Sequence, residues 1–494
     1  MQRFPVQRVS FALLLTVTVF LSALLLGGAS QQHIPGNAIL YAISAAALFA
    51  LAPGLLAQKW PYEFRFALIL TSLLFCVVSI QLVPLPSEIE KAFPGHNLLS
   101  EIRSALPELS FRHTWTMSSA HTLQSLFSLL PPLAVYAGVS ILDYRGRMHL
   151  VRIFLLFTFL SVFMGFLQLF GGPGSPLRLY AITDFRSSVG FFANRNHLAA
   201  LYYCAIPFVA VWYVRSLQLA QPQLKRRKAK ERRNYFPIVA AGIMSLVIIL
   251  GVTMTVSRAG LALSLLAIIA TVAIVYLHFR SSHSKSGDRE GSKTIYHLMI
   301  VFVVALSVAV YYGYDLVISR LNLTDEARAS IGSQSWNVVK AFFPFGAGAG
   351  TFEPVFKTFE TGDTARNAIV NRAHNEYIEW LIDAGAFAIA IFLLAIAWLF
   401  ERIVRVWGPR FNHFSGQELL LVRTSAIPPV LLLLHSAVDY PLRTGALACL
   451  LAACAGFMTR SLGDAPRSEM AKHRPSRSGN GQMAPDNELR STQR

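Results

Sequence analysis

Long apolar runs separated by short polar segments extend along almost the whole chain, and this pattern predicts membrane-spanning helices. A helix needs about 20 apolar residues to cross a hydrocarbon core of about 30 Å, and runs of this length recur between residues 9 and 459. The strands of a membrane barrel would instead alternate apolar and polar positions over about 10 residues. We expect twelve spans, at residues 9–28, 37–57, 65–84, 121–142, 150–171, 197–216, 236–255, 259–278, 297–316, 385–403, 420–438 and 443–459.

Two long polar intervals, at about 85–120 and 317–384, interrupt the spans and are expected on the outer side of the membrane. The second interval also contains short helical patterns. The predicted fold is therefore an all-α membrane protein of about twelve transmembrane helices with a large outer loop that contains short helices. Residues 1–460 form this domain, and residues 461–494, rich in Ser, Arg, Asn, Gln and Pro, form a disordered basic tail.

Composition and charge agree with this assignment and add an orientation. Apolar residues make up 54% of the chain and charged residues 14%, whereas globular proteins average about 25% charged, which excludes a soluble enzyme. The net charge of +18 comes from basic residues that recur in alternate connections, as cytoplasmic loops require. Both termini are therefore expected in the cytoplasm. The basic run at 225–233 is interpreted as an orientation signal that contacts anionic lipid, with no nucleic-acid partner.

Three local features affect the assignment of the spans. The N-terminal apolar run ends in the small residues 27–30, which resemble a signal-peptide cleavage site; cleavage would leave eleven spans, but the charge pattern favours an uncleaved anchor. Pro428 and Pro429 interrupt the span at 420–438, which neighbouring helices can accommodate. All four cysteines lie inside spans and are expected to pack there, without a disulfide or metal framework.

Twelve spans also suit a polysaccharide or drug exporter. Transporters of charged substrates place ionisable residues near the membrane midplane. Here only Asp315, His435 and Asp439 come close, and each lies toward one end of its span. The polar chemistry gathers on the outer side, which disfavours transport.

The first outer cluster comes immediately before the span at 197–216. It contains Arg186, Asn194, Arg195 and Asn196. Arginines at a helix start suit an anion, because the free N–H groups there carry partial positive charge. An interfacial loop whose arginines contact lipid phosphate explains the same pattern equally well.

Two further clusters lie at turns. Arg258 is in the tight turn between two spans, so it either reaches lipid headgroups or holds a ligand at the membrane surface. Gly346, Gly348 and Gly350 alternate with other residues, but no Lys-Ser/Thr pair follows them as in a phosphate-binding loop. We interpret this glycine-rich segment as a tight structural turn.

The fourth cluster begins with His374, Asn375 and Glu376. As a helix that ends at Gly385, this segment has an apolar stripe, and His374 lies at its edge one turn before Ile378. An imidazole exchanges protons near neutral pH, which makes His374 a candidate acid or base. No metal-ligand spacing accompanies it, so no metal is expected.

In their order and spacing these motifs resemble the bacterial O-antigen ligase and O-antigen polymerase superfamily. The shared features are Arg186 followed by Phe-Phe-Ala-Asn-Arg-Asn, then Ser-Arg258-x-Gly, the glycine-rich turn, and His374-Asn375 with nine residues to Gly385. The resemblance covers roughly residues 120–440. One departure is Ala388, where the ligase motif carries Gly, Thr or Tyr.

The resemblance implies a glycosyltransferase of the bacterial inner membrane whose active site faces the periplasm, so that the large loop is periplasmic. The implied donor is an undecaprenyl-diphosphate-linked glycan, the acceptor is lipid A-core or a growing glycan, and neither cofactor nor metal takes part. Arg186 and Arg258 would bind the diphosphate, and His374 would take the proton of the acceptor hydroxyl with inversion at the anomeric carbon. Glu376, Glu379 or Asp439 would orient the imidazole. The supporting candidates are Asn194, Arg195, Asn196, Asn375, Glu376 and Asp439.

The acceptor is left open by the sequence. The His374-Asn375 motif favours an O-antigen ligase over a polysaccharide polymerase, and glycosylation of a protein hydroxyl uses the same chemistry. The alternative from another class is the exporter.

Overall fold

The computed structural model describes residues 6–31, 34–57, 60–105, 113–220, 236–282, 325–360, 369–408 and 416–459. Within them the regular elements are helices, apart from one isolated bridge between Pro84 and Thr114, which confirms the all-α class. Eight helical segments are long and apolar enough to cross a membrane, and shorter apolar helices lie at Ser10–Leu26, Val239–Thr255 and Gly445–Phe457. The chain is therefore a multi-pass membrane protein.

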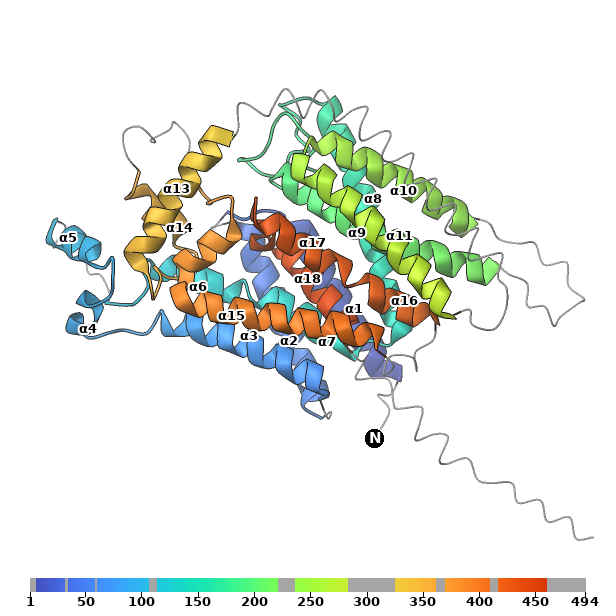
Figure 1. Cartoon of the computed structure of the whole chain (residues 1–494), viewed down its shortest axis with the longest axis horizontal. Coiled ribbons are helices and arrows are strands. Elements are labelled where there is room, and N and C mark those ends of the chain that lie inside the picture. Colours follow the sequence, from blue (N-terminus) through green and yellow to red (C-terminus); the bar gives the residue numbers. More distant parts are fainter. Residues whose placement is uncertain are drawn as a thin grey trace, which may run out of the picture.

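The helices follow one another as shown in Figure 1. They are α1 (Val6–Leu26), α2 (Pro35–Leu56), α3 (Tyr62–Ile80), α4 (Ser87–Lys91), α5 (Asn97–Ala105), α6 (Ser119–Phe127), α7 (Leu130–Ile141), α8 (Tyr144–Phe170), α9 (Arg195–Ala220), α10 (Phe236–Thr255), α11 (Arg258–Ser282), α13 (Asp325–Phe342), α14 (Phe352–Lys357), α15 (Glu376–Trp407), α16 (Gly416–Thr424), α17 (Ile427–Ser436), the 3₁₀ turn η2 (Pro441–Arg443) and α18 (Gly445–Phe457).

Each predicted span that lies within the described residues coincides with helix. The span at 121–142 is divided into α6 and α7, and the span at 420–438 into α16 and α17, with proline in the first turn of α17. The span at 297–316, the basic run at 225–233 and the tail at 461–494 lie outside the described residues. The full twelve-span layout and its orientation therefore remain predictions.

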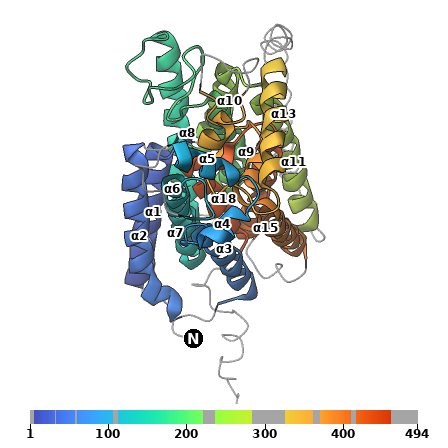
Figure 2. The same ribbon diagram turned by 90° about the vertical axis from the view of Figure 1, so that its left-hand side faces the viewer.

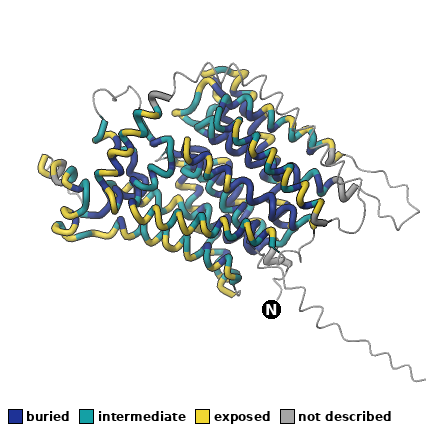
Figure 3. The backbone as a smooth tube through the Cα atoms, viewed as in Figure 1, coloured by how far each residue is buried: buried dark blue, intermediate teal, exposed yellow. Residues whose placement is uncertain are grey.

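The core of the bundle is formed mainly by α1, α7, α8, α9 and α18, which contribute most of its buried apolar residues. Figure 3 colours these buried residues dark blue. On α9 the run 198–205 is completely enclosed. Helices on the outside of the bundle keep apolar side chains exposed, such as Phe49 of α2 at 84%, as lipid contact requires. The short helices α4, α5 and α14 lie with the longer α13 at the left-hand end of Figure 1, and Figure 2 looks onto this end.

The end of the bundle at which α9, α11, α15 and α18 begin is called the site face below. The connection between α1 and α2 lies at this face and joins several helix ends. The carbonyl of Gly27 accepts a hydrogen bond from the amide of Ala446 (3.0 Å), and that of Gly28 from the amide of Ala193 (3.1 Å). A Cβ on Gly28 would lie 2.1 Å from the carbonyl oxygen of Phe191. The small residues that resemble a cleavage site therefore allow the close backbone approach that holds α1 against the start of α9 and α18.

The glycine-rich segment is the predicted structural turn, and it packs on α15. Gly346 and Gly348 both have positive φ, and a Cβ on Gly346 would lie 2.6 Å from the amide nitrogen of Ala384. Opposite this turn α15 is kinked at Gly385 (φ 52°, ψ −125°). The predicted helix end at Gly385 is confirmed: the backbone there is non-helical, so α15 consists of two helices joined by a kink, and the second helix continues to Trp407.

Replacing Gly28 by Ala should destabilise the bundle, because the new methyl group would collide with the backbone of the 191–193 segment. We expect a loss of about 1–3 kcal/mol in unfolding free energy, measured as a lower melting temperature of the purified protein in detergent. Gly242→Ala on α10 is the control, because nothing lies within 4 Å of its Cβ position. Equal melting temperatures for the two variants would contradict the close approach.

Candidate functional site

His374 lies in the turn before α15, in a left-handed backbone conformation (φ 53°). The helical assignment of this residue from sequence is wrong, because Asn375 is the N-cap and α15 starts at Glu376. The Asn375 Oδ1 accepts hydrogen bonds from the amides of Tyr377 (3.0 Å) and Ile378 (3.2 Å). Such a cap satisfies amides that the first turn leaves free. It turns the chain so that the imidazole lies outside the helix.

The imidazole of His374 faces the carboxylate of Asp439, which follows α17. Nδ1 of His374 is 3.4 Å from Oδ1 of Asp439, within ion-pair distance, and the Asp439 side chain is completely buried. The other carboxylate oxygen accepts a hydrogen bond from Nδ2 of Asn196 (2.5 Å) at the start of α9. His374, Asp439 and Asn196, three of the predicted residues, therefore meet at one point.

The two other acidic candidates contact different groups. Glu376 is buried and accepts a hydrogen bond from the hydroxyl of Ser436. Glu379 is also buried and accepts from Arg372 (3.1 Å) and from the amide of Ala373 (2.9 Å). Of the three carboxylates proposed from the sequence to orient the imidazole, Asp439 is the one that faces it.

Burial by itself would raise the pKa of the Asp439 carboxyl. The His374 imidazole and the nearby His197 and His435 outweigh burial and hold this pKa well below its ordinary value of 3.8. Asp439 is therefore a carboxylate at neutral pH.

Arg258 is connected to this cluster through the residue before it. The hydroxyl of Ser257 donates to Oδ1 of Asn196 (2.8 Å) and accepts from the amide of Gly260 (3.0 Å), which caps the start of α11. Helix α11 packs closely on α9, because a Cβ on Gly260 would lie 2.3 Å from the Cβ of Ala199. Arg258 is thus the first residue of a helix whose N-terminus adjoins the Asp439 cluster.

Arg186 lies on the 171–194 loop with an exposed side chain. In the part of the chain that the structure describes, this side chain makes no hydrogen bond or ion pair. Its backbone is held by Arg178, whose guanidinium donates to the carbonyls of Asp184 (2.7 Å), Phe185 (3.0 Å) and Ser187 (3.1 Å). The role of Arg178 could not be predicted from the sequence, because nothing in its spacing indicates which carbonyls it reaches.

The loop is also attached to its neighbours. The amide of Ser188 donates to the carbonyl of Met254 near the end of α10 (3.2 Å). Arg195 pairs with Asp184 (3.2 Å), so this arginine serves the loop itself. Arg186 lies on the same face as Arg258 and is the more exposed of the two.

Asn194 and Tyr440 complete the surroundings of the imidazole. Asn194 accepts from the amide of Asn196 (2.8 Å) at the start of α9 and donates to the hydroxyl of Tyr440 (3.4 Å). The Tyr440 ring contacts the rings of both His374 and His197, with centroid distances of 5.2 Å and 4.9 Å. The role of Tyr440 was not foreseen from the sequence, although it directly follows Asp439.

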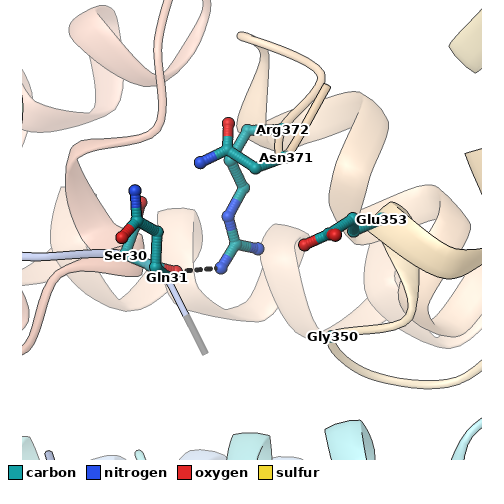
Figure 4. Close-up of a pocket in the computed structure, with 6 residues that line it drawn as sticks. All are labelled: Ser30, Gln31, Gly350, Glu353, Asn371 and Arg372. Carbon is teal, nitrogen blue, oxygen red and sulfur yellow. Dashed lines mark hydrogen bonds between the residues drawn. The ribbon is translucent and has the colours of Figure 1, made fainter. Parts of the chain in front are cut away.

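A buried group of four charged side chains lies beside the His374 turn. Arg372 pairs with Glu379 (3.1 Å), and Arg443 lies 2.8 Å from Asp383 and 3.5 Å from Glu379. Figure 4 shows the guanidinium of Arg372 donating to the carbonyl of Ser30, at the edge of a small open pocket. Neither arginine was among the predicted site residues.

The arrangement brings together an imidazole with a buried carboxylate and an arginine at a helix N-terminus. The first pair is suited to taking a proton from a hydroxyl group. The arginine at the helix N-terminus is suited to binding an anion such as a phosphate.

Comparison with known proteins agrees with the resemblance found in the motifs. Residues 243–393 match a family model described as O-antigen ligase. The matched region contains Arg258, the glycine-rich turn and His374, whereas Arg186 and Asp439 lie outside it. No curated protein matches the chain.

Asp439→Asn should alter the pH dependence of stability. Because the folded-state pKa of Asp439 is lowered, the ionised carboxylate stabilises the fold fully above about pH 5, and this contribution is lost as the pH falls toward the lowered pKa. We expect the variant to melt at a lower temperature than the wild type at pH 7, with a smaller further loss between pH 5 and pH 3.

The control is Glu353→Gln, which removes the exposed pair between Glu353 and Lys357 and should leave the curve almost unchanged. Parallel acid curves for wild type and Asp439→Asn would contradict the assignment of a buried, ionised Asp439.

Proposed function

We propose that this chain, which belongs to the O-antigen ligase and polymerase superfamily, transfers a glycan from an undecaprenyl-diphosphate donor to an acceptor sugar hydroxyl. The site lies on the periplasmic face of the bacterial inner membrane, and lipid A-core is the acceptor. One observation carries the proposal: His374 faces Asp439, and Asp439 is linked through Asn196 and Ser257 to the helix start that bears Arg258.

The donor must bring its own leaving group, because sugar nucleotides are not found outside the inner membrane. A diphosphate at the depth of the lipid headgroups would be bound by Arg258, with Arg186 contributing from the neighbouring loop. Arginine keeps its charge and offers a fixed fork of donors that fits phosphate oxygens. The N-terminus of α11 adds partial positive charge to Arg258. Both features stabilise the negative charge that grows on the diphosphate as the sugar leaves.

His374 acts on the acceptor in this proposal. Its imidazole takes the proton of the acceptor hydroxyl as the oxygen bonds to the anomeric carbon. The bond from that carbon to the phosphate oxygen breaks in the same step, and the diphosphate leaves with the electron pair. Attack from the face opposite the leaving group inverts the anomeric centre. Asp439 stabilises the imidazolium that forms, and Asn196 holds Asp439 in place.

Lipid A-core is proposed as the acceptor because the matching family model is described as O-antigen ligase and because His374-Asn375 is followed by Gly385 at the ligase spacing. A polymerase would use the same residues and extend a lipid-linked glycan instead. The two acceptors can be offered side by side in one assay.

His374→Ala should lower turnover by about 10²–10⁴-fold, the usual contribution of proton transfer. The assay combines purified protein, a lipid-diphosphate-linked glycan and lipid A-core, and follows the transferred glycan on gels. His149→Ala, at an exposed histidine near the start of α8 and far from the 171–194 loop, is the control and should retain wild-type turnover. Transfer to lipid-linked glycan alone would identify a polymerase. Absence of transfer to any acceptor by the wild-type protein would contradict the proposed function.

Arg258→Lys and Arg186→Lys should each lower turnover although the charge is kept, because an ammonium group cannot form two parallel hydrogen bonds to phosphate. We expect a decrease of about 10-fold or more, in line with the loss of a donor to a developing charge. Arg280→Lys, at the other end of α11, is the matched control. Unchanged rates in the first two variants would show that these arginines do not bind the diphosphate.

A further inference from the structure

The turn that carries His374 is fixed by contacts both before and after this residue. On the C-terminal side, Asn375 caps α15 and donates through Nδ2 to the carbonyl of Ala437 (3.0 Å). On the N-terminal side, Arg372 and Ala373 are buried and contact Glu379. His374 itself is partly exposed, with 28% of its side chain accessible.

Glu379 makes two separate contacts with this turn from the first turn of α15. Its Oε1 accepts a hydrogen bond from the amide of Ala373 (2.9 Å), directly before His374, and its Oε2 accepts from the guanidinium of Arg372 (3.1 Å). Arg443 lies 3.5 Å from the same Oε2. One completely buried carboxylate thus fixes the two residues that precede the imidazole.

The left-handed conformation of His374 makes such support necessary. A residue with a Cβ rarely has positive φ, and it keeps this conformation only when the surrounding contacts impose it. The contacts that fix the backbone before His374 come from Glu379. The imidazole can face Asp439 only while the turn keeps this form.

Two carboxylates and two guanidinium groups meet around Glu379. Glu379 and Asp383 provide two carboxylates, and Arg372 and Arg443 provide two guanidinium groups. Arg372 also donates to the carbonyl of Ser30 (Figure 4), so the network connects the His374 turn to the loop between α1 and α2.

From this geometry we infer that Glu379 is a positioning residue: it acts through the backbone of residues 372–374 and sets the imidazole of His374 against Asp439. The expected effect of Glu379 on catalysis rests on the proposed function. Its effect on the position of His374 does not. Glu379 touches neither the imidazole nor any group proposed to bind the donor.

The test is a double-mutant cycle with Glu379→Gln and His374→Ala. Gln keeps the size of Glu379, but its amide cannot accept from both Ala373 and Arg372 as the carboxylate does. We expect Glu379→Gln to lower kcat about 10–100-fold, as a small misplacement of a reacting group does, with KM for the lipid-linked donor changed less than about 3-fold. In the His374→Ala background, Glu379→Gln should change the residual rate less than about 3-fold, because residues that act as a unit are not additive.

Arg147→Gln is the matched control, since Arg147 is also buried and donates to the carbonyls of Phe457 and Thr459 at the other end of α18. It should lower the melting temperature in detergent but leave kcat per folded molecule unchanged. If Glu379→Gln lowered the rate by the same factor with and without His374, Glu379 would be a structural residue only and the inference would be overturned.

A second measurement does not depend on transfer activity. The rate at which diethyl pyrocarbonate modifies His374, followed by mass spectrometry of peptides, should change at least about 3-fold in Glu379→Gln and stay constant in Arg147→Gln. An unchanged rate in Glu379→Gln would overturn the inference. If the rate of His374 modification changed in Glu379→Gln but the wild-type protein showed no transfer activity, the positioning role would be supported and only the proposed function would be refuted.

Discussion

The carboxylate of Asp439 has no contact with solvent, so it needs hydrogen-bond donors and positive charge from the protein itself. Asn196 at the start of α9 supplies a donor, the amide of Tyr440 supplies another, and His374 before α15 faces it as the group that can carry charge. Three connections far apart in the sequence thus converge on one carboxylate. The imidazole of His374 is one of the groups that meet this requirement.

Close backbone packing allows the helix ends to converge. A protein built only of helices has no sheet edge on which to place a site, so its polar residues must come from caps and turns. Gly28, Gly260 and Gly348 each lie where a Cβ would collide with a neighbouring element. Because these approaches are so close, Ser257 reaches Asn196, and the glycine-rich turn reaches the kink of α15. The same geometry places Arg258, the first residue of α11, beside the Asp439 cluster.

Much of the fold could be predicted from sequence, because the length and apolarity of a span are local properties. Each predicted span within the described residues coincides with helix, and the candidate residues lie at helix ends or in loops. The resemblance of the motifs is matched by the family model. The start of α15 was predicted too early. The apolar stripe continues toward the N-terminus beyond the cap, and a pattern of apolar positions does not distinguish an N-cap Asn375 from an Asn inside a helix.

The partners of the candidate residues could not be predicted, because they depend on which helix ends meet. The sequence left Glu376, Glu379 and Asp439 as equal partners for the imidazole, and only tertiary contacts distinguish them. The same reason applies to three residues that were not predicted, Arg178, Arg372 and Tyr440. The two arginines donate to backbone carbonyls, which no sequence pattern identifies, and the ring of Tyr440 contacts His374 from a distant part of the chain.

The central claim is that a histidine activated by a buried aspartate drives a direct displacement at the anomeric carbon. The most direct measurement is the anomeric configuration of the new glycosidic bond, determined by NMR on product made by the purified protein from a lipid-linked donor of known configuration. We expect the configuration to be inverted relative to the donor. Retention would require a covalent sugar–enzyme intermediate or attack from the same face, and would contradict the role assigned to His374 and Asp439.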